Sequence, residues 1–416
     1  MNNRQCTFLI AFVILLALMV GIGTHALADG GEHAGDLGAA AAPSEVSGDT
    51  VIHFPDPNFE AAVRELILKP TGDIIASDVA EVRSLSVNGR GIADLAGIEY
   101  FTALEALYCE SNRLTELDVS KNTALRVLYC EGNLLTELDL SQNPALERLV
   151  CAVNYLTTLD VSHNPMLSVL NCEVNDLTEL DLSQNPLLTE LYCNMTGLTT
   201  LNVTQSPLLR EFHCAEGKLE TLDVSQNPAL EVLILYNNRL TELDVSQNPA
   251  LKRLYCAGNR LTTLDVSQNL ALQWLHCGYN QLTTLDVGKN AVLEVLSCFS
   301  NELTTLDVRY NTALERLSCN SNQLTELDVS HNPALEELHC DGNQLKALDV
   351  SHNPALARLY CGSNQLTKLD LSHNKALKWL SYSNNLFADQ TAIIGLDEEQ
   401  LEHFEFDPQG LQIPQP

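Results

Sequence analysis

The chain has 416 residues, of which 45% are hydrophobic, so it carries enough apolar material to fold and too much to remain disordered. Its 54 acidic residues outweigh 23 basic ones and give a formal net charge of −31. A nucleic-acid-binding surface needs basic residues to displace counterions, and anionic lipids also attract basic segments, so this composition argues against both partners.

Residues 1–28 are typical of a secretory signal peptide. Arg4 provides a positive start, residues 8–22 form an apolar core, and an A-x-A cleavage sequence ends at Ala28. The apolar core is shorter than the roughly 20 residues that a membrane helix needs. We therefore expect an exported protein, secreted or associated with the cell surface, that is not inserted in the membrane once the signal is cleaved.

A spacer and a helical cap are expected before the main body of the chain. Residues 29–50 are largely glycine, alanine and acidic residues, which bury little, so they predict a flexible spacer. Asp56 followed by proline is typical of a helix start. We expect a helical N-terminal cap over residues 51–84, with a second short helix near Ser77. The first helix has one apolar face, made of Phe59, Ala62, Val63, Leu66 and Ile67.

From residue 85 to residue 387 the sequence repeats every 21 residues. Each unit follows the leucine-rich-repeat pattern L-x-x-L-x-L-x-x-N-x-L, with cysteine in one leucine position. Leu235 and Tyr382 replace the cysteine in two repeats, and a C-terminal cap and tail are expected over residues 388–416. The cysteines of this row are Cys109, Cys130, Cys151, Cys172, Cys193, Cys214, Cys256, Cys277, Cys298, Cys319, Cys340 and Cys361.

Within each repeat, the alternation of residues places the same side chains inside every coil. In residues 317–319 leucine and cysteine point inward and serine points outward, as in a β-strand. Residues 327–330 alternate in the same way and predict a second, shorter extended segment on the opposite side. Asn322 and Asn332 fall at the two corners, where a short amide side chain can satisfy the backbone of a turn. A single coil cannot bury its own apolar faces, so the coils must stack and their strands must form a parallel sheet.

These repeats resemble those of the internalin family of secreted bacterial surface proteins, in particular the internalin J-like type. The resemblance rests on the 21-residue period, the cysteine row and the sequence Leu-Thr-x-Leu-Asp-Val-Ser-x-Asn-Pro, and it covers about residues 55–405. It implies a right-handed leucine-rich-repeat solenoid with a parallel β-sheet on its concave face. Short extended segments and turns would form the convex side, with a small helical N-terminal cap. The resemblance also implies a role in protein recognition, often in adhesion to host cells.

Three rows of equivalent residues have both a structural and a functional interpretation. The cysteine row predicts buried free thiols, with disulfides between neighbours or a soft-metal site as alternatives. An aspartate row from Asp118 to Asp370, broken by Asn202, predicts a solvated or hydrogen-bonded surface, with a calcium-binding stripe as the alternative. Three successive repeats place histidine at one corner, which leaves a metal or acid-sensing site open. These histidines are His331, His352 and His373.

The outward residues of the concave strands carry the strongest functional signal. Large residues depart from the repeat there on four consecutive coils, and Tyr, Trp and Arg dominate the hot spots of protein interfaces. A face that contacts only water has no reason to display such side chains, and we expect Tyr255 and Trp274 to point outward on adjacent coils. The predicted partner-binding residues are Tyr236, Arg253, Tyr255, Trp274, His276, Tyr279 and Phe299.

One stretch of the repeat is irregular. Within a single turn, Thr196, Asn202, Ser206 and Gly217 replace residues that are otherwise constant. Because stacked coils are stabilised by contacts with their neighbours, we expect residues 193–217 to be a weak point.

The sequence favours a binding protein over an enzyme. It contains no G-x-S-x-G, H-E-x-x-H, C-x-x-C or phosphate-loop motif, so we expect no catalysis, no metal and no cofactor. We predict a monomer that binds a protein partner through its concave face. A glycan or cell-wall polymer is the alternative partner, because exposed aromatic rings also stack on sugars. The remaining alternative is a structural scaffold without a specific ligand.

Overall fold

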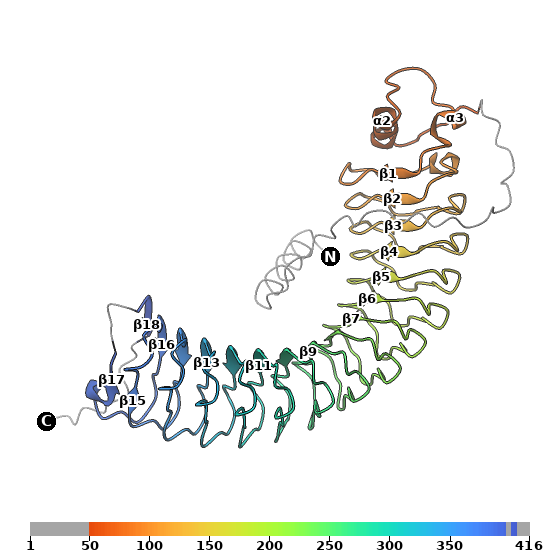
Figure 1. The fold of residues 1–416 in the computed structure, drawn as a ribbon. Coiled ribbons are helices and arrows are strands. Elements are labelled where there is room, and N and C mark those ends of the chain that lie inside the picture. The colour runs from red at the N-terminus through yellow and green to blue at the C-terminus, as the bar shows by residue number, and fades with distance from the viewer. Residues whose placement is uncertain (1–49, 397–400, 406–416) are drawn as a thin grey trace. The chain divides into compact units, whose positions relative to one another are not determined.

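The computed structural model describes residues 50–396 and 401–405. The predicted signal peptide, all but the last residue of the predicted spacer and the end of the tail lie outside these residues. Within the described part of the chain, no helix is long and apolar enough to cross a membrane. The described residues belong to one unit of stacked coils (Figure 1).

A helical cap packs on the first coils. Helix α2 (Pro57–Leu66) begins where predicted, because the Asp56 carboxylate accepts two hydrogen bonds from backbone N–H groups of the first turn, at 2.8 and 3.2 Å. Phe59 is fully buried and its ring stacks on that of Phe101, with centroids 6.4 Å apart. Leu66, predicted for the apolar face, is 44% exposed, since it is the last residue of the helix and lies beyond the packed turns.

Sixteen short strands form one parallel sheet in which consecutive coils are neighbours. The central leucines face one another across the sheet, as Leu275 does with Leu254 and Leu296. In Figure 1 the strands line the inner side of the curved stack, which confirms the predicted concave sheet. The strands are β1 (Ser84–Ser86), β2 (Ala106–Tyr108), β3 (Val127–Tyr129), β4 (Arg148–Val150), β5 (Val169–Asn171), β6 (Glu190–Tyr192), β7 (Glu211–His213), β8 (Val232–Ile234), β9 (Arg253–Tyr255), β10 (Trp274–His276), β11 (Val295–Ser297), β12 (Arg316–Ser318), β13 (Glu337–His339), β14 (Arg358–Tyr360), β16 (Trp379–Ser381) and β18 (His403–Glu405).

The opposite side of each coil is less regular than predicted. Leu327 and Val329 are buried and alternate with exposed residues, as expected for an extended segment. Regular pairing on this side is restricted to a two-stranded sheet near the end of the chain and to one bridge between Asn202 and Asp223 among the described residues. The smaller elements are α3 (Ala76–Val79), which is the predicted second helix, η1 (Ile98–Tyr100), η2 (Gln390–Ala392), β15 (Leu369–Asp370) and β17 (Ile393–Ile394).

Residues 388–396 and 401–405 continue the stack. Strand β17 pairs in parallel with β15, and β18 pairs in parallel with β16. Both sides of the last regular coil are therefore covered by one further, irregular coil. This segment serves as the C-terminal cap expected for a solenoid, which must shield its terminal apolar face.

Two ladders of buried asparagine hold the corners of the coils together. At the first corner, Asn322 donates through Nδ2 to the carbonyl of Cys298 in the preceding coil at 3.0 Å, and its Oδ1 accepts the N–H of Leu303 at 3.0 Å. At the second corner, Asn332 donates through Nδ2 to the carbonyl of Val308 at 3.0 Å. The same contacts recur from coil to coil, so the predicted corner role of both asparagines is confirmed.

The first ladder is interrupted where the sequence is irregular. Thr196 and Gly217 stand at the first corner and carry no amide, so the N–H groups of Leu177 and Leu198 lose the bond that asparagine supplies elsewhere. Ser206 at the second corner donates a single hydrogen bond to the preceding coil, at 3.1 Å, where asparagine makes two. The irregular stretch therefore has fewer contacts between coils than the rest of the stack.

Candidate binding surface

The strands arrange the outward side chains in columns. The first and third residues of each strand, and the residue after the cysteine position, point away from the core, and the parallel register aligns each of them from coil to coil. The seven predicted residues fall on four consecutive coils and are called the concave patch below. They are Arg253 and Trp274 in the first column, Tyr255 and His276 in the third, Tyr236 and Phe299 after the cysteine position, and Tyr279 one residue further on.

Trp274 is held by charged neighbours on both sides. The guanidinium carbon of Arg253, on the adjacent strand, lies over the indole at 5.2 Å from the ring centroid. The indole Nε1 donates to the Glu294 carboxylate at 3.3 Å. Trp274 is half-buried and Arg253 is exposed. The ring is therefore fixed in one orientation before any partner binds, which reduces the entropy lost on binding.

Tyr255 is not an exposed anchor, contrary to the sequence-based expectation. Its side chain points outward from β9, but it is only 3% exposed, because Ile234 and His276 flank it in the same column. The Tyr255 and His276 rings stack with centroids 4.6 Å apart and planes at 14°. Burial raises the pKa of Tyr255 to about 12 and lowers the pKa of His276 to about 4. Tyr255 therefore packs against its neighbours in the concave patch and offers almost no surface to a partner.

Tyr279 and Phe299 form the other edge of the patch. Their rings meet edge to face with centroids 4.9 Å apart, and Tyr279 is 63% exposed. Tyr279 lies in the turn after the strand, with φ at 49°, and not on the strand face where we expected it. The neighbouring Gly278 makes room for Phe299, because a Cβ at this glycine would lie 2.8 Å from the phenyl ring. Tyr236 is half-buried, and this burial raises its pKa to about 12.

A second group of side chains, which we did not include in the predicted site, lies on β6 and β7. The Tyr192 hydroxyl donates to the Glu190 carboxylate at 3.1 Å, and His213 Nε2 lies 2.9 Å from the Glu211 carboxylate. His213 holds the pKa of Glu211 below its usual range. The two glutamates occupy adjacent positions of the first column. Their recurrence on consecutive coils is the feature of the sequence that could have revealed this group. The group extends the polar surface on the N-terminal side of the concave patch.

Ring pairs recur along the third column. In each pair, rings from neighbouring strands lie side by side, so each ring covers part of the other. The pairs and their centroid distances are Tyr108–Tyr129 at 5.3 Å, Tyr192–His213 at 4.7 Å, Tyr255–His276 at 4.6 Å and His339–Tyr360 at 4.2 Å.

The cysteine row is a buried structural feature. All twelve of its cysteines are free and buried, and the Leu235 and Tyr382 side chains that replace cysteine are buried as well. Burial raises the pKa of the Cys130 and Cys256 thiols to about 12, so these groups are protonated at neutral pH. The position therefore accepts any apolar group of suitable size, as predicted.

The aspartate and histidine rows are engaged in turns on the convex side. The Asp139 carboxylate accepts the N–H of Ser141 at 2.9 Å, and this hydrogen bond holds the pKa of Asp139 below its usual range. His331 Nδ1 lies 3.0 Å from the hydroxyl of Ser330, and the other two histidines repeat this contact. Within the described residues no group of three or more His, Cys, Asp or Glu side chains is placed to hold a metal ion.

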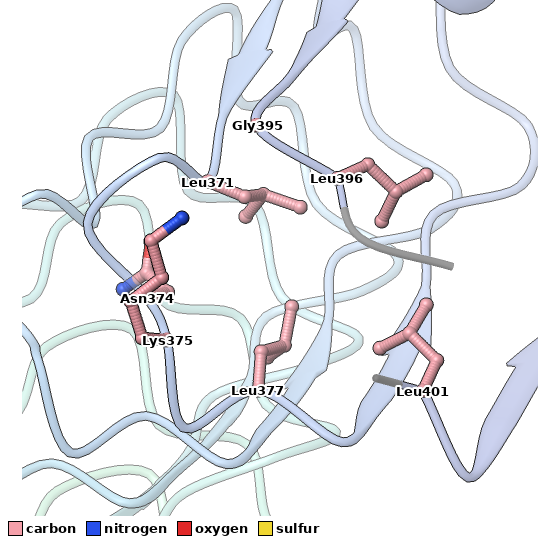
Figure 2. Close-up of a pocket in the computed structure, with 7 residues that line it drawn as sticks. All are labelled: Leu371, Asn374, Lys375, Leu377, Gly395, Leu396 and Leu401. Atoms are coloured by element: carbon pink, nitrogen blue, oxygen red, sulfur yellow. The ribbon is translucent and has the colours of Figure 1, made fainter. Parts of the chain in front are cut away.

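Neither of two hollows in the described surface overlaps the concave patch. One is a gap of about 10 Å³ under the C-terminal cap, roughly the space that a single water needs. Figure 2 shows Leu371, Leu377, Leu396 and Leu401 around this gap, with Asn374 and Lys375 to one side. The other is an open groove along residues 94–160, lined by acidic side chains of the aspartate row and its neighbours together with leucine and other apolar residues.

Comparisons with known proteins agree with this architecture. Residues 228–269 match the family model described as leucine-rich repeats in two copies. Internalin J of Listeria monocytogenes serotype 4b (strain F2365) is 40% identical over 71 residues. This match covers 17% of the chain and spans only 8% of the length of that protein.

Two solved structures extend the similarity over most of the chain. The functional domain of internalin J from Listeria monocytogenes, which includes a cysteine ladder, is 41% identical, with a TM-score of 0.77. The similarity covers 80% of this chain and 74% of that domain. A leucine-rich-repeat protein of Leptospira interrogans is 27% identical, with a TM-score of 0.67, over 76% of this chain and 93% of that one.

Proposed function

The chain belongs to the internalin family of leucine-rich-repeat proteins, and from this premise we propose that it is an exported, non-enzymatic module that binds a protein partner through its concave face. The contact of Arg253 with Trp274 carries the proposal. Together with Glu294 it presents a pre-oriented indole on a face whose equivalent positions mostly carry smaller or charged side chains. In this role the chain would act in adhesion or in recognition of a host or other partner. The proposal assigns it no catalytic step and no cofactor.

The contacts of the rings favour a protein over a glycan. Stacking on a sugar needs a free aromatic face. Arg253 already occupies one of the two faces of Trp274, and Tyr255 and His276 cover each other. Tyr279 is the most exposed ring of the concave patch and is the residue on which the glycan alternative depends. A protein partner can use the edges of the rings and the charged groups beside them, as interface hot spots do. A structural scaffold without a specific ligand would need neither the oriented rings nor the charged groups beside them.

Binding of residues 29–416 to arrays of extracellular proteins and of glycans tests the proposal. We expect protein ligands whose signal is lost in Trp274→Ala. Tyr310→Ala is the matched control, because Tyr310 is 58% exposed and Arg309 lies over its ring at 5.9 Å, but on the convex side. Glycan ligands that depend on Tyr279 would favour the alternative partner. Ligands that bind both variants equally would exclude the concave patch.

A further inference from the structure

A row of large apolar side chains lies beside the second corner, away from the concave patch. It occupies the position just before a buried leucine of the repeat, where ten of the fourteen repeats carry alanine. On three consecutive coils this position holds instead Met166, Leu187 and Leu208, which are 47%, 38% and 47% exposed. These three residues are called the flank stripe below. Apolar residues that replace alanine on successive coils and remain exposed indicate a contact surface.

Charged residues bound the segments that bear the flank stripe but do not lie within them: Asp160 and Asp181 precede two of these segments, and Glu190 and Arg210 follow two. Residues 161–169, 182–189 and 203–209 contain no Asp, Glu, Lys or Arg. Ser168 and Thr189 stand in a row that is charged in most other repeats, and each hydroxyl donates at 3.0 Å to a backbone carbonyl of the preceding coil. Covering the stripe therefore leaves neither hydroxyl without its hydrogen bond.

The charges that border the flank stripe are already paired within the chain. On one side Arg126 pairs with Glu147 at 2.7 Å. On the other side Glu231 pairs with both Arg210 and Lys252, the latter at 2.6 Å. This row thus holds three basic and two acidic side chains, in a protein whose net charge is −31. It is a part of the surface that a second acidic molecule can approach with little repulsion.

We propose that the flank stripe is a self-association surface and that its occupant is the flank stripe of a second copy of this chain. Under a two-fold axis through Leu187, Met166 of one copy faces Leu208 of the other, and the two Leu187 side chains face each other. The equal spacing of the coils makes this match automatic, because each residue lies one coil from the axis. The charge-free segments favour a complement without charge, and the same surface of a second copy supplies one at the matching spacing.

The expected association is weak and responds to salt in a characteristic direction. Three side chains bury far less than the roughly 1,200 Å² of a stable interface, so the pairing should depend strongly on concentration. Added salt screens the repulsion between two acidic molecules and should therefore strengthen the association. The proposed dimer differs from the monomer that we expected from the sequence, and it leaves the concave face of each copy free.

Sedimentation velocity of residues 29–416 across a wide concentration range tests the inference. We expect a reversible monomer–dimer equilibrium that tightens with sodium chloride and is weakened at least about tenfold in Leu187→Asp. Val292→Asp is the matched control, since Val292 has the same position in the repeat and is 45% exposed, but lies four coils beyond Leu208. It should associate like the unmodified protein. Circular dichroism must show that both variants are folded.

Cross-linking gives a second readout that does not depend on affinity. Leu187→Cys places a thiol on the two-fold axis, so mild oxidation should link two copies, whereas Val292→Cys should remain unlinked. A protein that stays monomeric at every concentration and salt, or two variants that behave alike in both experiments, would overturn the inference.

Discussion

The guanidinium of Arg253 lies over the indole of Trp274, with 5.2 Å between the arginine Cζ and the ring centroid. The two residues occupy the same column on neighbouring strands, so the parallel register of β9 and β10 brings them together. Elsewhere the same column holds mainly valine, arginine or glutamate. The repeat thus provides a regular frame, in which a tryptophan beside an arginine replaces the usual residue of this column at position 274, and again at position 379 beside Arg358.

Tyr255→Ala should destabilise the fold although its side chain points outward. The ring is 3% exposed and packs against His276, so its removal leaves a cavity and should cost about 3 kcal/mol. Leu254→Ala, which removes an inward side chain, should cost roughly 2–5 kcal/mol. Trp274→Ala should change the stability far less, because this ring is half-buried. Urea denaturation of the three variants checks the order, and equal stability of Tyr255→Ala and the unmodified protein would contradict it.

The thiols of the cysteine row should be free and protected. All twelve are buried, and burial raises their pKa wherever a shift is resolved, so the reactive thiolate is scarce in the native state. Alkylation without reductant should modify few of them in native protein and nearly all after denaturation. Recovery of several linked cysteine pairs by peptide mapping would show that the row forms disulfides instead.

Hydrogen exchange should be faster over residues 193–217 than over residues 319–361. Thr196 and Gly217 interrupt the first asparagine ladder, so local opening breaks fewer contacts between coils there. Thr196→Asn should restore the bond to Leu177 N–H and slow the exchange of that coil, with a gain of about 1 kcal/mol. Exchange rates that are uniform along the stack, or unchanged in Thr196→Asn, would contradict this account.

His276 should make the fold less stable in mild acid. Burial lowers its pKa from 6.5 to about 4, so between these values the unfolded chain binds a proton that the folded chain does not. The contribution of the neutral ring is complete above pH 6.5 and decreases as the pH falls toward 4, by about 3 kcal/mol at most.

Urea unfolding at pH 7.5 and pH 5 measures this effect. In His276→Asn the loss of stability between the two pH values should be smaller, whereas in the exposed His331→Gln it should match that of the unmodified protein. An identical pH dependence in all three proteins would show that His276 is not the source of the lower stability in mild acid.

The sequence predicted the frame well because a repeat makes spatial neighbours readable. The inward positions of Leu317 and Cys319 and the corner roles of Asn322 and Asn332 follow from the local pattern, and stacking then repeats them. The exposure of Tyr255 could not be read in this way. It depends on which side chains the two adjacent strands place beside it, and Ile234 and His276 happen to be large enough to cover it.

Tyr279 shows the other limit of the sequence. Its position adopts a left-handed backbone conformation, so the side chain leaves the strand face. The glycines at the equivalent positions 132, 258 and 342, all with positive φ, were the signal that could have shown this. The concave patch is therefore narrower than predicted on the strand face and extends further into the turns.

The most direct measurement of the central claim is the dissociation constant of a partner that binds residues 29–416, compared between Trp274→Ala and Tyr310→Ala. Loss of the indole should weaken binding by at least about 2 kcal/mol, or roughly thirtyfold. Loss of the convex tyrosine, which has a similar arginine contact, should leave the constant unchanged. If both variants bind as tightly as the unmodified protein, or if the tyrosine variant alone is weakened, recognition does not occur at the concave patch.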